Sequence, residues 1–190
     1  MPTLQNILPM PTPNLLSIHM LDPLLPLRAS LAPWWDTITA GVRAAPDPHL
    51  AAINLSRVLA HGTGSGTILG QPKRCADLLF VLGASQHLTT VLLRQAEQWE
   101  AAFLSDCNAP VHSVAEYLSG LRGQLPLSMP EEEFLAGLRA YRERAYLRIG
   151  TRDLLGLATL EETTQELSAL AEAAVQVAYE YTRAQVCAVY

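Results

Sequence analysis

Along most of the chain beyond residue 47, apolar residues recur every three to four positions, which is the spacing of one face of an α-helix. The pattern is strongest in the last third, where it predicts two long helices. Each is preceded by a Ser/Thr-x-x-Glu capping box, at 128–131 and at 159–162. The predicted apolar faces comprise Phe134, Leu135, Leu138, Tyr141, Ala145 and Ile149 in the first helix, and Leu167, Leu170, Ala171, Ala174, Val177, Ala178 and Tyr181 in the second. With a turn near Gly156 between them, the two helices are expected to pack as an antiparallel pair.

Shorter helices are predicted between residues 47 and 123. Asp47 is a candidate N-cap, followed by Pro48 at the first helical position of a helix that reaches about His61. Further helices are expected over 73–82, 86–94, 97–104 and 111–121, with Ser85 as the cap of the second. No convincing alternation typical of strands is found. The predicted fold class is therefore all-α, a multi-helix array that ends in the long antiparallel pair.

The first 48 residues have a different composition. They contain nine of the 13 prolines, and each proline removes a backbone donor and restricts the preceding residue. This proline-rich N-terminal arm, residues 1–48, is expected to hold only short helical turns, such as one over 14–21, and to precede a helical domain of residues 49–190. Trp34 and Trp35 are interpreted as a hydrophobic plug against another part of the chain, with a ligand platform as the alternative.

Composition and charge narrow the classes of partner. With 190 residues, 49% hydrophobic and 16% charged, the chain is able to bury one sizeable core. Its 13 basic and 18 acidic residues give a net charge of -5, which argues against nucleic acid or an anionic membrane surface as a partner. The chain has no apolar run of the roughly 18 residues that a membrane-spanning helix needs, and no secretory pattern precedes Arg28, its first positive charge. The three cysteines form no pairing motif, so a reducing cytoplasmic location is expected.

A search for catalytic chemistry finds little. None of the five histidines lies three or four residues from another, and no Gly-x-Ser-x-Gly elbow occurs. The glycine-rich segment 62–70 lacks the Gly-Lys-Ser/Thr ending of a phosphate loop and is interpreted as a linker. The acidic run 131–133 fits the first turn of a helix, where carboxylates oppose the helix dipole. No catalytic, cofactor-binding or metal residue is predicted.

Arginines are the most distinctive polar feature. Arg144, Arg148 and Arg152 are spaced by four and so share one helical face. A guanidinium is a rigid fork of donors, so this possible interaction row is suited to phosphate or to the carboxylates of a partner. The alternative is pairing within the chain, with acids such as Glu143, Asp153 or Glu161, and we favour it over ligand binding.

Several blocks of sequence resemble the glutamine synthetase adenylyltransferase family. The residues concerned are YRERAYLRI at 141–149, RDLLGL at 152–157 and LEETTQELSALAE at 160–172. They are similar, in order and spacing, to an arginine-rich helix, a turn and a following helix of that family. Upstream, VLGASQHLTTVLLR at 81–94 and NLSR at 54–57 are similar to two further helical segments, so the resemblance extends over about residues 50–185.

The resemblance implies a bifunctional enzyme that transfers AMP from ATP to a tyrosine of glutamine synthetase and removes it again. ATP and Mg²⁺ would be its cofactors, and glutamine synthetase and the PII signal protein its partners. The family's nucleotidyltransferase motifs, a GMGKLGG loop and an SDIDL acidic pair, do not occur here, so no catalytic residue carries over.

The leading hypothesis is therefore an N-terminal helical fragment of such an enzyme, from its deadenylylating half, with no cofactor in this chain and no activity alone. The alternative is a free-standing helical protein-interaction module that has diverged from the family.

Overall fold

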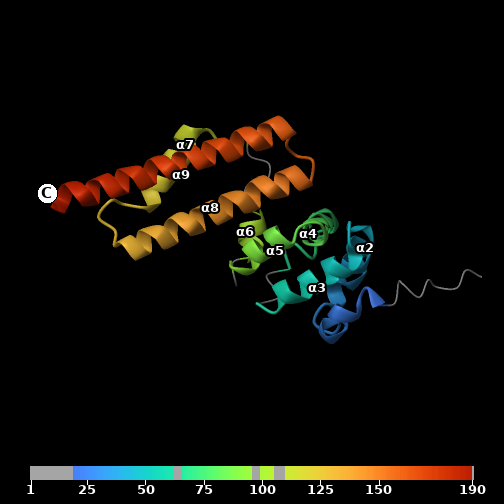
Figure 1. Ribbon diagram of the computed structural model, residues 1–190. Coiled ribbons are helices and arrows are strands. Elements are labelled where there is room, and N and C mark those ends of the chain that lie inside the picture. Colours follow the sequence, from blue (N-terminus) through green and yellow to red (C-terminus); the bar gives the residue numbers. More distant parts are fainter. Residues whose placement is uncertain (1–18, 62–65, 96–98, 105–109, 190) are drawn as a thin grey trace, which may run out of the picture.

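The structure is a computed structural model that describes residues 19–61, 66–95, 99–104 and 110–189 (Figure 1). Regular structure within these ranges is helical throughout, which confirms the all-α prediction. Two 3₁₀ helices come first, η1 (Asp22–Leu27) and η2 (Ala32–Trp34). The α-helices follow as α2 (Trp35–Ala44), α3 (Pro48–Leu59), α4 (Pro72–Ala84), α5 (Gln86–Leu93), α6 (Trp99–Leu104), α7 (Val114–Gln124), α8 (Glu131–Leu154) and α9 (Leu160–Val189).

The buried apolar residues form two separate clusters. The N-terminal cluster contains residues of η1 and of the five helices from α2 through α6. Helix α4 lies at its centre and packs against α2 and α3. The C-terminal cluster joins α7, α8 and α9. Helix α8 belongs to both, because Leu147 is buried in the first cluster and Ile149 in the second. Figure 1 shows this arrangement, with the long α8–α9 pair leading away from the bundle of shorter helices.

The arm predicted over residues 1–48 is more helical than expected over its described part. Residues 1–18, with most of the turn predicted over 14–21, lie outside the described residues. Helix α2 has ten residues, where only short turns were predicted, because residues 35–44 contain no proline and place Ile38 and Val42 on one buried face. Trp34 and Trp35 are half-buried and pack against the N-terminal cluster, as the plug interpretation expects.

Trp34 packs closely against the described part of the glycine-rich segment and leaves no space for a side chain at Gly66. Gly66 has a positive φ of 74°, and a Cβ there would lie 2.5 Å from the indole of Trp34. A side chain at this position would therefore meet both backbone strain and a clash. Residues 62–65, the first part of the predicted linker, lie outside the described residues.

Helices α8 and α9 run antiparallel, as predicted (Figure 1). The chain reverses at Gly156, whose φ of 66° is a left-handed conformation suited to glycine, and the N–H of Leu157 donates to the carbonyl of Arg152 at 2.8 Å. The predicted capping box at Thr159 is confirmed, because the Glu162 N–H donates to the Thr159 hydroxyl and the Thr159 N–H donates to the Glu162 carboxylate.

The other predicted capping box is wrong. Pro130 occupies the N-cap position of α8 and makes no side-chain capping bond, so Ser128 lies outside the helix. The predicted apolar faces also need correction, because Leu135 on α8 and both Leu167 and Ala171 on α9 are exposed. The helical period is correct in these segments, but the direction of each helix face is set by its neighbours.

None of the described helices, taken singly, has the length and apolar character of a membrane span. One pair, α4 and α5, passes on length and composition only when joined across its 114° bend.

Candidate functional site

The arginine row lies on α8, where the helix passes between the two apolar clusters. The structure separates its three members by burial: Arg144 is exposed, whereas Arg148 and Arg152 are buried. Spacing by four residues does keep all three on one side of the helix, as predicted. Only the N-terminal end of the row, however, is open to a partner.

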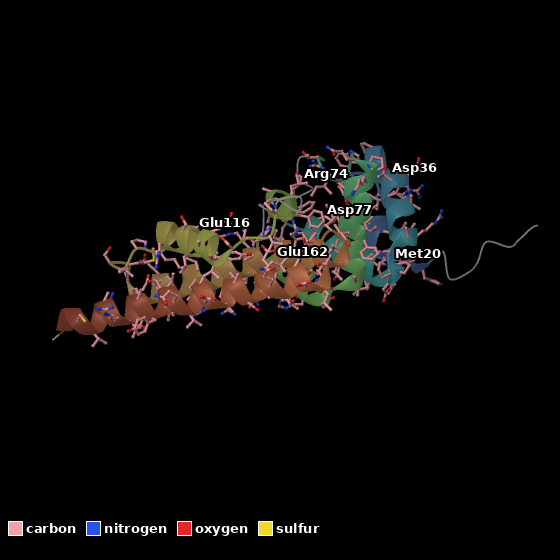
Figure 2. All side chains as sticks on the ribbon, turned by 90° about the horizontal axis from the view of Figure 1, so that it is seen from above. Met20, Asp36, Arg74, Asp77, Glu116 and Glu162 are labelled. Atoms are coloured by element: carbon pink, nitrogen blue, oxygen red, sulfur yellow. The ribbon has the colours of Figure 1, made fainter. Side chains whose placement is uncertain are left out.

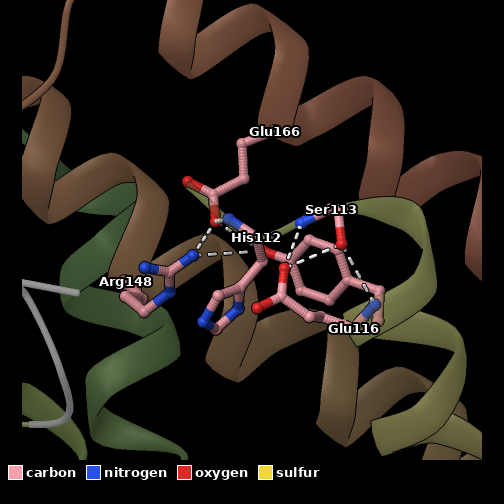
Figure 3. Close-up of polar contacts among 6 residues, drawn as sticks. His112, Ser113, Glu116, Arg148 and Glu166 are labelled. Atoms are coloured by element: carbon pink, nitrogen blue, oxygen red, sulfur yellow. Dashed lines mark hydrogen bonds and ion pairs between the residues drawn. The ribbon is translucent and has the colours of Figure 1, made fainter. Parts of the chain in front are cut away.

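Arg148 forms a buried ion pair with Glu166 of α9, and the two side chains are only 7% and 2% exposed. The same Glu166 oxygen, Oε1, accepts the hydroxyl of Tyr117 at 3.0 Å and the backbone N–H of His112 at 3.0 Å. A long contact of 3.4 Å joins Arg148 Nη2 to the Tyr117 hydroxyl. Figure 3 shows the guanidinium and the carboxylate facing each other across α8 and α9, with His112 beside them. The cluster therefore ties α7, α8 and α9 together at one point.

Burial sets the protonation of the tyrosine in this cluster. The pKa of Tyr117 is raised mainly by burial, with the Arg148 charge acting in the opposite direction. Its hydroxyl therefore remains protonated and available as a donor to Glu166 at neutral pH. The ring of His112 packs edge-on to that of Tyr117, with the centroids 5.3 Å apart, and completes the apolar side of the cluster.

The start of α7 holds this arrangement in place. Ser113 and Glu116 form a capping box: the Glu116 N–H donates to the Ser113 hydroxyl, and the Ser113 N–H donates to the Glu116 carboxylate at 2.7 Å. The hydrogen bonds that the Ser113 N–H and then its hydroxyl donate to the Glu116 carboxylate lower the pKa of Glu116. The cap fixes the direction in which the chain enters α7, and hence the position of the His112 N–H that bonds Glu166 (Figure 3).

Arg144 has a different environment. Its Nη2 donates to the side-chain oxygen of Gln124, at the end of α7, at 2.9 Å, and its guanidinium lies 5.9 Å from the ring centroid of Tyr141. Both contacts are at the surface, so they orient the guanidinium without neutralising its charge. This is the one member of the row that can donate to an external carboxylate or phosphate.

The acids named as possible partners of the row have other roles where contacts are described. Glu143 pairs with Arg94 at the end of α5, and Asp153 accepts the hydroxyl of Thr163 at 3.0 Å. Pairing within the chain, the favoured interpretation, occurs through Glu166 instead. Its register was the missed signal, because Glu166 precedes the buried Leu170 by four residues and so lies on the apolar face of α9.

Among the described residues, no three His, Cys, Asp or Glu side chains form a group that could hold a metal ion. An open groove of about 580 Å³ lies between the start of α7 and α9, and its lining includes His112, Ser168 and Glu172. The groove flanks the buried Arg148–Glu166 cluster.

Comparison with known proteins assigns the chain to a family. The sequence model of the glutamate-ammonia ligase adenylyltransferase family matches residues 75–190. This chain belongs to that family. The match includes α5 to α9 and nearly all of α4, with the whole arginine row, but it starts after the segment 50–74, over which the resemblance was also expected.

Individual relatives agree with this assignment. The bifunctional glutamine synthetase adenylyltransferase/adenylyl-removing enzyme of Shewanella woodyi is 34% identical over 116 residues, which are 60% of this chain and 12% of the relative. The enzyme of the same name from Pseudomonas aeruginosa gives the same figures, and that of Bordetella pertussis is 37% identical over 94 residues, 47% of this chain and 10% of the relative. The chain thus spans about an eighth of the length of the first two relatives. No solved structure matches it.

Proposed function

We propose that this chain is an N-terminal helical region of a bifunctional glutamine synthetase adenylyltransferase/deadenylylase, with a supporting and docking role and no catalysis of its own. The observation that carries the proposal is the family match over residues 75–190, which falls on a helical array in which the polar cluster is committed to internal pairing. The nucleotidyltransferase glycine loop and Asp-x-Asp pair do not occur in the sequence. ATP and Mg²⁺ would accordingly bind elsewhere in the complete enzyme.

The proposed partner is glutamine synthetase, after which the relatives are named. Arg144 is the proposed contact, because it is exposed, charged and oriented by Gln124 and Tyr141. Regulation of the complete enzyme by the PII signal protein and by glutamine is part of the same proposal, as is a cytoplasmic location. Arg148 and Arg152 would act indirectly, by fixing α8 against its neighbours.

The test is binding of purified chain to immobilised glutamine synthetase by surface plasmon resonance. Arg144→Glu is expected to weaken binding by about tenfold or more, because it places a like charge against a carboxylate of the partner. Arg139→Glu is the matched control: it is on the same helix, exposed and undergoes the same charge change, but lies on a different helix face. Equal binding by both variants and the unmodified chain would contradict the assigned role of Arg144.

A second candidate, the free-standing interaction module, is favoured by one observation. Residues 19–74 lie outside the family match, yet η1, α2 and α3 complete the apolar cluster around α4. This packing supports a unit that folds alone. Such a module would bind a protein other than glutamine synthetase, so the same resonance experiment separates the two candidates.

A further inference from the structure

The outer face of α9, directly opposite the side that packs on α7 and α8, carries an apolar seam. Its members recur at spacings of three and four, and the large ones are strongly exposed: Val175 is 70%, Tyr179 60% and Val186 52% exposed. Thr182, also exposed, lies between Tyr179 and Val186 on the same line. Figure 2 shows α9 along one edge of the molecule. Ordinary surface helices present polar residues here, so the seam indicates an interaction surface.

Two opposite charges flank the seam on one side. Glu172 lies one turn before the Val175–Tyr179 pair and Arg183 one turn after it, and both are exposed. Within the described part of the chain neither of them forms an ion pair. They are separated by 11 residues, which is about 16 Å along a helix, too far for them to pair with each other.

This order of charges is self-complementary. When two copies of α9 pack antiparallel about a two-fold axis between Val175 and Tyr179, Val175 of each copy meets Tyr179 of the other. Residues on one side of an antiparallel seam meet the same side of the partner helix, so Glu172 of each copy then lies beside Arg183 of the other. A parallel pairing would instead place the two Glu172 side chains on opposite sides of the seam, and the two Arg183 side chains likewise, so that no Glu172–Arg183 pair could form.

We infer that the outer face of α9 is a homodimerisation surface, in which two copies of this chain pack antiparallel through the Val175–Tyr179 seam and are aligned by two symmetric Glu172–Arg183 ion pairs. Isologous contacts of this kind close at two subunits. A single helix face is smaller than the roughly 800 Å² per partner of a standard interface, so the dimer is expected to be weak and to depend on concentration.

The experiment is sedimentation equilibrium of the full chain over a range of concentrations. The unmodified chain is expected to shift from monomer towards dimer as concentration rises. Val175→Asp should abolish the shift, since it buries a charge in the seam. Arg74→Glu, an exposed charge reversal on α4, is the control and should leave the dissociation constant unchanged.

Charge swapping then tests the alignment. Glu172→Arg alone and Arg183→Glu alone should each weaken dimerisation by about tenfold or more, because each places like charges together. The double variant Glu172→Arg/Arg183→Glu should restore the original dissociation constant. A monomer at every concentration would overturn the inference and leave the seam to another occupant, such as glutamine synthetase or a further part of a longer polypeptide. Dimerisation without rescue by the double variant would overturn the antiparallel alignment.

Discussion

The Arg148–Glu166 pair gives the sharpest test of how the C-terminal helices are held together. Replacing Arg148 by Met keeps an unbranched apolar stem in place of the side chain's aliphatic part but removes the guanidinium and its charge. Glu166 would then be a carboxylate only 2% exposed, left with the His112 N–H and the Tyr117 hydroxyl as donors. Removing one partner of a buried ion pair costs about 3–5 kcal/mol, because the remaining charge is uncompensated. Arg148→Met is therefore expected to lower the free energy of unfolding by that amount.

The matched control is Arg144→Met, one helical turn earlier. This side chain is exposed and donates to Gln124 at the surface, so its loss should cost less than about 1 kcal/mol. Urea denaturation followed by circular dichroism measures both variants. The double variant Arg148→Met/Glu166→Leu should recover much of the loss, since it removes the buried charge as well. The reasoning would be refuted if Arg148→Met cost no more than Arg144→Met.

Three further predictions concern local features. Thr159→Ala should lower the free energy of unfolding by about 1 kcal/mol, because it removes the cap of α9. Ser128→Ala should have little effect, because that serine caps no helix. Urea denaturation of both variants measures the difference. Gly83→Ala should be destabilising in the same assay, since its Cβ would lie 2.9 Å from the Asp47 carbonyl oxygen, and an unchanged midpoint would contradict this close packing. Hydrogen bonds from Arg122 and Gln176 lower the pKa of Glu180 to about 2, so Glu180 contributes stability above its unfolded pKa that is lost as the pH falls towards 2. NMR titration should find that Arg122→Met raises the Glu180 pKa towards its ordinary value, and no rise would rule out the pairing.

The sequence was sufficient for the helical elements and for several of their ends. Asp47, Ser85 and Thr159 cap helices as predicted, because capping depends on residues within one turn of chain. Ser128 does not, because the intervening Pro130 takes the N-cap position itself. Local chemistry thus predicts a helix start well, unless two local signals compete.

The candidate site was predictable only in part, for a physical reason. Spacing placed Arg144 and Arg148 on one face of α8 but could not say which of them a neighbouring helix would cover. That depends on the position of α7 and α9, which is a tertiary property. The register of Glu166 on the apolar stripe of α9 can be seen in the sequence, but its partner Arg148 is identified only once α8 and α9 are placed side by side.

The proposal that this chain is a non-catalytic docking region is tested most directly by calorimetric titration of the purified protein. One titration uses glutamine synthetase and the other ATP with Mg²⁺. The account predicts saturable heat with glutamine synthetase and none with ATP. Specific ATP binding, or no interaction with glutamine synthetase, would contradict it.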